Sequence, residues 1–183
     1  DVAIVGAGIS GAFMAHELSR DHSVVVLDRR PPLTGATMAS TALLQWEIDL
    51  PLTALTEKIG VEMAKRAYLR SRAAVDDLKR IVTDERIVCG LKAKDSLYLV
   101  GDAYGRRALE AEAGARAAIG LDSVFIGPAA LRERFGIDRT GAIVSSGSAS
   151  ADPARLAAAV SPVLIIALCA VASPVAAGIL VLT

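Results

Sequence analysis

Residues 1–30 read DVAIVGAGISGAFMAHELSRDHSVVVLDRR, and this stretch decides the fold of the N-terminal part of the chain. Val2–Val5 is a short apolar run rich in β-branched residues, which is typical of a strand buried on both faces. A glycine-containing turn and a helical pattern ending at Leu18 follow, and Val24–Leu27 is a second apolar run. Strand, turn, helix and strand in this order predict a βαβ unit, with two parallel strands and a right-handed crossover.

The turn between the first strand and the helix has the pattern GxGxxG, written here Gly6-Ala7-Gly8-Ile9-Ser10-Gly11. Gly6 permits the tight turn, Gly8 lets a pyrophosphate approach the backbone, and Gly11 lets the helix lie close to the strand. The free N–H groups at the helix start, around Ile9 and Ser10, and the positive end of the helix dipole would bind the pyrophosphate. The turn therefore predicts a site for a dinucleotide.

Asp28 ends the second apolar run, where a carboxylate can accept hydrogen bonds from both hydroxyls of an adenosine ribose. A carboxylate there also repels a 2′-phosphate, whereas an adjacent arginine can accommodate one, and Arg29 and Arg30 follow directly. From the residues alone, FAD and NAD(P) both remain possible ligands of the turn.

The 183 residues carry 20 Lys+Arg and 20 Asp+Glu, so the formal net charge is zero. Nucleic-acid-binding proteins are usually clearly basic, and nucleic acid is therefore not expected as a partner. Cys89 and Cys169 lie far apart in the sequence and no histidines cluster near them, so neither a disulfide framework nor a metal site is expected. No secretory signal peptide opens the chain, and a reducing, cytoplasmic location is expected.

The rest of the chain alternates helical and strand-like patterns. A long connection over 29–52 contains a run of small residues from Gly35 to Ala42, and loops of this length are usually functional. Apolar periodicity predicts one helix over 53–82 and an Ala-rich helix over 106–119, with Glu110 and Glu112 exposed. Further elements are expected as strands at 97–100, 124–126 and 141–150, a helix at 128–135 ended by Gly136, and a helix beginning at Asp152-Pro153.

Three stretches of the N-terminal part, namely 1–30, Gly35-Ala36-Thr37 and STALLQ at 40–45, resemble the FAD-dependent oxidoreductases of the D-amino-acid oxidase, glycine oxidase and sarcosine oxidase superfamily. SLYL at 96–99, GAIV at 141–144 and DPARL at 152–156 are also similar to that family. The resemblance extends to about residue 159. It implies an α/β fold, with a Rossmann-like FAD/NAD(P)-binding βαβ core and the beginning of an antiparallel substrate domain.

The resemblance also implies roles for individual residues. Gly6, Gly8 and Gly11 match the pyrophosphate turn, Asp28 matches the acid that holds the adenosine ribose, and Arg29 matches a basic position after that acid. The segment 35–44 resembles the loop beneath the FAD phosphates, where Ser40 and Thr41 could donate hydrogen bonds and where Leu43 also lies. Short side chains in this loop would let the backbone approach a cofactor. No residue is assigned to catalysis.

The implied domain organisation has four parts. Residues 1–85 form the FAD-binding core and cofactor loop, and 86–150 form the start of the substrate domain. Residues 151–159 begin a helix, and 160–183 form an apolar tail without a charged residue. The resemblance ends before this tail, so an incomplete chain is expected.

The tail leaves three interpretations open. It is long enough for a membrane anchor, since a bilayer needs about 20 apolar residues, and the protein would then be membrane-associated. It also fits two buried strands, Val163–Val171 and Val175–Leu182, split by Ser173-Pro174. The third interpretation is a truncated or disrupted coding sequence.

The resemblance indicates an FAD-dependent oxidoreductase that oxidises the C–N bond of amino acids or related amines by hydride transfer to the flavin. Its partner would be a small-molecule amine or amino acid. The alternatives are a non-catalytic FAD-binding fragment, tethered to a membrane by its tail, and an NAD(P)-dependent enzyme.

Overall fold

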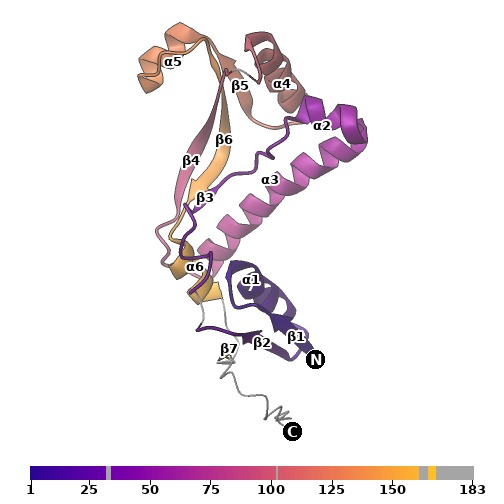
Figure 1. The fold of residues 1–183 in the computed structure, drawn as a ribbon, viewed down its shortest axis with the longest axis vertical. Coiled ribbons are helices and arrows are strands. Elements are labelled where there is room, and N and C mark those ends of the chain that lie inside the picture. Colours follow the sequence, from indigo (N-terminus) through magenta and orange to yellow (C-terminus); the bar gives the residue numbers. More distant parts are fainter. Residues whose placement is uncertain (32–33, 102, 161–164, 168–183) are drawn as a thin grey trace. The chain divides into compact units, whose positions relative to one another are not determined.

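The structure of the protein, a computed structural model, describes residues 1–31, 34–101, 103–160 and 165–167, which form two compact units (Figure 1). The first unit contains Asp1–Ser40 and the described residues of 153–183, and the second contains Thr41–Asp152. The domain boundary expected after residue 85, between the FAD-binding core and the substrate domain, stays a prediction. By their contacts, the helices over 52–84 group with the second unit.

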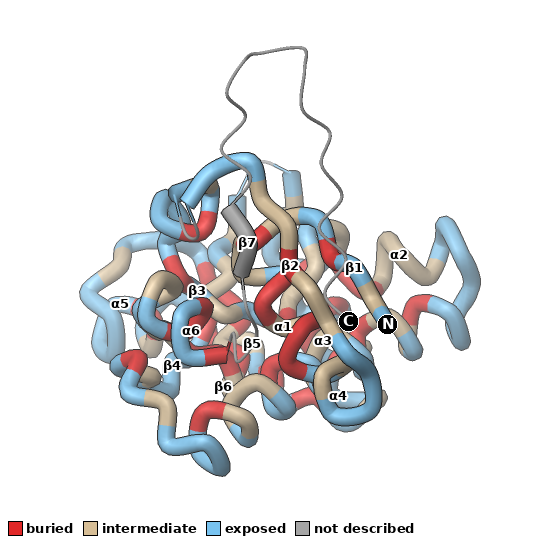
Figure 2. Tube along the Cα trace, turned by 90° about the horizontal axis from the view of Figure 1, so that it is seen from below, coloured by how far each residue is buried: buried red, intermediate tan, exposed pale blue. Residues whose placement is uncertain are grey.

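The first unit is built on a parallel sheet with the strand order β1-β2-β7. Strands β1 (Val2–Val5) and β2 (Val24–Asp28) pair in register from Val2↔Val24 to Val5↔Leu27, with α1 (Ile9–Leu18) between them in the chain. Buried residues, red in Figure 2, occur on all three elements, and Ile4, Ala15 and Val26 form their common core. The predicted βαβ unit with parallel strands is therefore confirmed.

The C-terminal segment adds a helix and a strand to the first unit. Helix α6 (Pro153–Val160) packs on α1, and β7 (Ile165–Ala167) pairs in parallel with β2. Strand β7 falls within the first of the two strands that one interpretation of the tail expected. Residues 161–164 and 168–183 lie outside the described residues, and so does most of the expected tail. No helix in the described part of the chain is both long and apolar enough to span a membrane.

The second unit contains an antiparallel sheet, as expected for the beginning of a substrate domain. Strand β6 (Ala142–Ser150) is central and pairs with β3 (Leu43–Leu44), β4 (Lys92–Leu99) and β5 (Ser123–Ile126). The helices of this unit are α2 (Leu52–Ile59), α3 (Val61–Asp84), α4 (Arg106–Ala118) and α5 (Pro128–Phe135). Helix α3 runs alongside β6 (Figure 1).

The prediction of a single helix over 53–82 is wrong in one respect, because this segment forms two helices. Gly60 separates α2 from α3 with φ of +83°, a backbone conformation that residues other than glycine rarely adopt. The apolar periodicity continues across the break and therefore conceals it. The helix predicted over 128–135 is confirmed, and Gly136 ends it in the left-handed conformation with φ of 68°.

Glu112 on α4 is buried, and its predicted exposure is wrong. Its side chain is 1% exposed and contacts the start of α2, where Pro51 precedes the first helical residue and offers no capping side chain. The Glu112 carboxylate accepts hydrogen bonds from the backbone N–H of Leu52 at 2.7 Å and of Thr53 at 2.8 Å, and from the Thr53 hydroxyl at 2.8 Å. A negative charge from another helix therefore caps the positive end of α2.

Arg116, one turn further along α4, completes this buried cluster. Its Nε donates to Glu112 Oε1 at 2.7 Å, and its guanidinium carbon lies 5.6 Å from the ring centroids of both Trp46 and Tyr68. Trp46 Nε1 donates to the carbonyl oxygen of Ser146 at 2.8 Å, which ties the segment after β3 to the central strand. The segment 44–53 is thus fixed by α4 and β6 together.

We expect Glu112→Ala to lower the free energy of unfolding by about 3 kcal/mol or more, because it removes the hydrogen-bonded partner of the buried Arg116 and leaves that guanidinium only a long ion pair, of 3.9 Å, to Glu47. Glu110→Ala on the same helix is the matched control, since Glu110 pairs with Arg106 at the surface and should contribute less than about 1 kcal/mol. Urea denaturation followed by the fluorescence of Trp46, the only tryptophan, measures both variants. Equal urea midpoints for the two variants would contradict the capping role.

The same carboxylate should make stability depend on pH. Burial raises the pKa of Glu112, but hydrogen bonds from Thr53, Arg116 and Leu52 outweigh it and hold the pKa below the ordinary value of 4.5. The stabilisation is therefore complete above pH 4.5 and is lost as the pH falls through the lowered pKa. Between pH 6 and pH 3 the free energy of unfolding of the wild type should fall more steeply than that of Glu112→Gln. Parallel pH profiles would disprove this assignment.

Candidate functional site

The glycine turn connects the end of β1 to the start of α1. Gly6 has φ of +109°, and its N–H donates to the carbonyl oxygen of Leu27 on β2 at 2.7 Å. Gly8 is extended, and its carbonyl oxygen accepts the first bond of the helix from Ala12 N–H at 3.0 Å. The backbone thus turns sharply after β1 and enters the helix within three residues.

Gly11 allows the helix to begin directly against this turn. A Cβ built on Gly11 would lie 1.9 Å from the carbonyl oxygen of Gly6, far closer than any side-chain carbon can approach a backbone atom. The third glycine of the pattern is therefore required by space, as the sequence predicted.

The N-terminus of α1 is suited to an anion. No acidic residue occurs in the first turn, so the positive end of the helix dipole is not neutralised there. The N–H of Ile9 donates to Thr37 Oγ1 at 3.0 Å. The N–H groups of Ser10 and Gly11 precede that of Ala12, which is the first to donate within the helix, and therefore have no acceptor there. Two backbone donors and the hydroxyl hydrogen of Thr37 are thereby available to a phosphate.

Asp28 connects the end of β2 to the glycine turn. Its Oδ2 accepts the N–H of Ala7 at 2.7 Å and its Oδ1 accepts the N–H of Arg30 at 2.9 Å. These two bonds, Ala7 first, hold the pKa of Asp28 below its ordinary value of 3.8, so the side chain is charged at neutral pH. A carboxylate has about four lone-pair positions, and those that remain can accept the two hydroxyls of a ribose.

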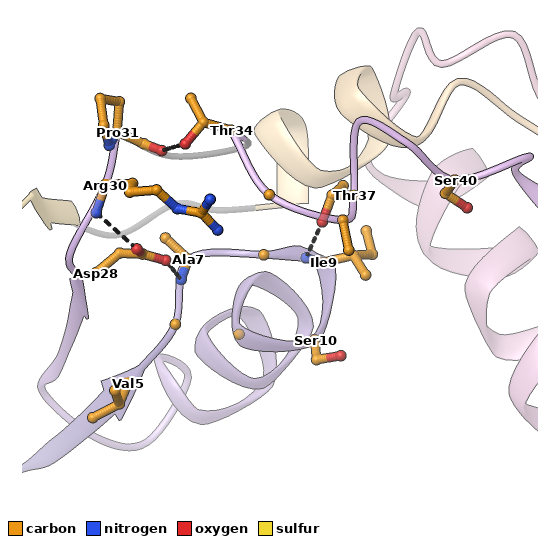
Figure 3. Close-up of a pocket in the computed structure, with 15 residues that line it drawn as sticks. Val5, Ala7, Ile9, Ser10, Asp28, Arg30, Pro31, Thr34, Thr37 and Ser40 are labelled. Atoms are coloured by element: carbon orange, nitrogen blue, oxygen red, sulfur yellow. Dashed lines mark hydrogen bonds between the residues drawn. The ribbon is translucent and has the colours of Figure 1, made fainter.

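These groups line one pocket of about 510 Å³ in the first unit (Figure 3). Of the predicted cofactor-binding residues, the pocket brings together Gly6, Gly8, Ile9, Ser10, Gly11, Asp28 and Ser40. Asp28 and Ser40 lie at opposite ends of it (Figure 3). Arg29, Thr41 and Leu43 are not among the lining residues, and the last two belong to the second unit.

Thr37 and Arg30 also line the pocket, although no definite role there was predicted for either residue from the sequence. Thr37 is buried and lies over the turn, such that a Cβ built on Gly8 would be 3.3 Å from its hydroxyl oxygen. The signal for Thr37 was present, as a hydroxyl residue inside the run of small residues that begins at Gly35. Which of two successive arginines faces the pocket depends on the turn after β2, and no local pattern reveals it.

The pocket fits an adenine dinucleotide. Backbone donors at a helix N-terminus suit a pyrophosphate, a charged carboxylate at the end of β2 suits a ribose, and Gly8 leaves the backbone between them uncovered.

Comparison with known proteins agrees with this geometry. Residues 1–162 match the model of a protein family described as FAD dependent oxidoreductase. The structure of glycine oxidase from Geobacillus kaustophilus superposes with a TM-score of 0.68 and 25% sequence identity, over 88% of this chain and 43% of that chain. L-α-Glycerophosphate oxidase from Mycoplasma pneumoniae with FAD bound gives a TM-score of 0.67 and 18% identity, over 88% of this chain and 41% of that chain, and shows the shared fold.

A sequence relative is a Bacillus subtilis (strain 168) protein named as a Rieske 2Fe-2S iron–sulfur protein, YhfW. It is 27% identical over 123 residues, which are 67% of this chain and 24% of the relative. The chain thus spans less than half the length of each of these proteins.

We expect Gly11→Ala to disrupt the first unit, because the added methyl group would collide with the Gly6 carbonyl, which cannot move without breaking the turn. The loss of stability should be about 3 kcal/mol. Amide hydrogen exchange in β1 and β2 measures it. Gly114→Ala is the control, since it lies within α4 with nothing within 4 Å of the new Cβ and should slow exchange in that helix. Unchanged exchange in β1 and β2 of Gly11→Ala would show that the close approach is not required.

Proposed function

The chain belongs to the DAO family of FAD-dependent oxidoreductases, and on that premise we propose that its glycine-turn pocket binds FAD for the oxidation of a C–N bond in an amino acid or related amine. The observation that carries the proposal is the convergence of the α1 N-terminus and the Asp28 carboxylate on one pocket. The 25% identity with a glycine oxidase over 88% of this chain supports the amine substrate class.

In this proposal each predicted residue acts on a different part of the cofactor. The N–H groups of Ser10 and Gly11 would bind the pyrophosphate, with the Thr37 hydroxyl as a third donor. Asp28 would accept the ribose hydroxyls of the adenosine half. Gly6 and Gly8 would keep the turn narrow and uncovered, and Ser40 lines the end of the pocket away from Asp28. Arg29, Thr41 and Leu43 are not among the residues that line this pocket, and their predicted roles remain predictions.

When FAD is bound, its flavin supplies the acceptor for the hydride that is removed from the carbon beside the nitrogen. The described residues of the first unit act on the dinucleotide, by holding its phosphates and ribose in a fixed register on the sheet. This anchoring would set where the flavin projects from the pocket, since a misplacement of about 1 Å at a reacting centre can reduce a rate by about 100-fold. The substrate itself would be a small-molecule amine or amino acid.

We expect the purified chain to bind FAD in preference to NADH and NADPH, measured by equilibrium dialysis and by the change of flavin absorbance on titration. Gly8→Val should abolish FAD binding, because its branched side chain would cover the backbone at the closest approach and press on Thr37. Binding of NADPH without affinity for FAD would contradict the proposal and favour the NAD(P)-dependent alternative.

Gly105→Val provides the matched control for this variant. Gly105 precedes α4 with φ of −73° and ψ of 174°, much as Gly8 precedes α1 with φ of −84° and ψ of −173°. The two substitutions therefore place the same side chain before a helix in the same backbone conformation, one inside the pocket and one outside it. Normal FAD binding by Gly8→Val would show that the turn is not the cofactor site.

A further inference from the structure

Arg30 is the one residue with a permanent positive charge among the described residues that line the pocket. Its backbone N–H donates to Asp28 Oδ1 at 2.9 Å, which fixes the start of its side chain beside the ribose-binding carboxylate. The side chain then turns into the pocket, over Asp28 and Ala7 (Figure 3). Both arginines are exposed, but Arg29, its neighbour in the chain, does not line the pocket.

Gly35, which also lines the pocket, makes room for the guanidinium of Arg30. A Cβ built on Gly35 would lie 3.2 Å from Arg30 Nη2, so any side chain at this position would crowd the charged group. Gly35 does not have a positive φ, so its backbone conformation does not require glycine. The absence of a side chain matters here because it leaves space for the guanidinium. Gly35 thus leaves space beside the guanidinium of Arg30, which lines the pocket and is exposed to solvent.

The charge of Arg30 is available to a ligand. Among the described residues its guanidinium forms neither a hydrogen bond nor an ion pair, and its effect on Asp28 is that of a nearby charge. A guanidinium presents several donors in a planar fork, which matches the oxygens of a phosphate. The pocket therefore offers phosphate donors from two sides, the α1 N-terminus and Arg30.

We propose that Arg30 is a phosphate ligand of this pocket, which binds the pyrophosphate of an adenine dinucleotide from the wall opposite the glycine turn. The inference rests on the proposed function and adds a specific side chain to it. The same chemistry would also suit a 2′-phosphate on the ribose, but the charged Asp28 beside Arg30 repels a phosphate at that position.

Arg30→Ala and Arg29→Ala form a matched pair, because they remove the same charge from adjacent positions and change long-range electrostatics equally. Calorimetric titration with FAD, ADP and adenosine separates phosphate binding from adenine binding. We expect Arg30→Ala to weaken the binding of ADP and FAD by about tenfold or more, and the binding of adenosine by less than about twofold. Arg29→Ala should bind all three like the wild type. Arg30→Lys should recover part of the loss, because a lysine keeps the charge without the planar fork.

The outcomes distinguish this inference from the proposed function. If the wild type binds FAD and the two alanine variants bind ADP equally, Arg30 is not a phosphate ligand and the FAD site stands. If the wild type binds neither FAD nor ADP, the proposed function is wrong and this inference fails with it. If Arg30→Ala loses only NADP⁺, with ADP unchanged, the residue recognises a 2′-phosphate and the pyrophosphate assignment is overturned. Equal melting temperatures of both variants exclude a folding defect.

Discussion

The first unit depends on the close approach between Gly11 and the carbonyl oxygen of Gly6, where a side-chain carbon would lie only 1.9 Å away. Because Gly11 has no Cβ, α1 begins directly over the turn that ends β1. The Gly6 N–H fixes the same turn to β2, and β2 ends in Asp28, whose carboxylate accepts the N–H of Ala7. The backbone of the turn and the Asp28 side chain together thus bring two strand ends and a helix start to one pocket.

The pocket combines opposite charges that act on different parts of a ligand. The N-terminus of α1 and the guanidinium of Arg30 both favour an anion, whereas the carboxylate of Asp28 favours hydroxyl groups. Each oxygen of that carboxylate already accepts a backbone N–H, which keeps it charged and correctly oriented before any ligand arrives. Such a site is preorganised for a molecule that carries phosphate and ribose side by side.

The second unit is stabilised in a different way, by a carboxylate and a guanidinium that are both buried. Removing two charges from water is costly, and the cost is recovered only where further hydrogen bonds are made. Glu112 makes them to the first residues of α2, which has a proline before it and no cap of its own. The pair therefore fixes where α2 begins and holds α4 against it.

The sequence by itself determined the parallel βαβ unit, the glycine turn and Asp28, because strand hydrophobicity, glycine spacing and the position of an acid after a strand are local properties. It also indicated the antiparallel sheet through its resemblance to a family. Only the tertiary structure showed that Gly60 divides one periodic stretch into two helices, since periodicity does not report φ. Only the tertiary structure showed that Glu112 is buried. A buried carboxylate is tolerated here because it accepts hydrogen bonds from backbone N–H groups that lie 59 and 60 positions away in the sequence. That Arg30 and not Arg29 lines the pocket likewise depends on the path of the loop that faces Arg30. No short stretch of sequence encodes that path.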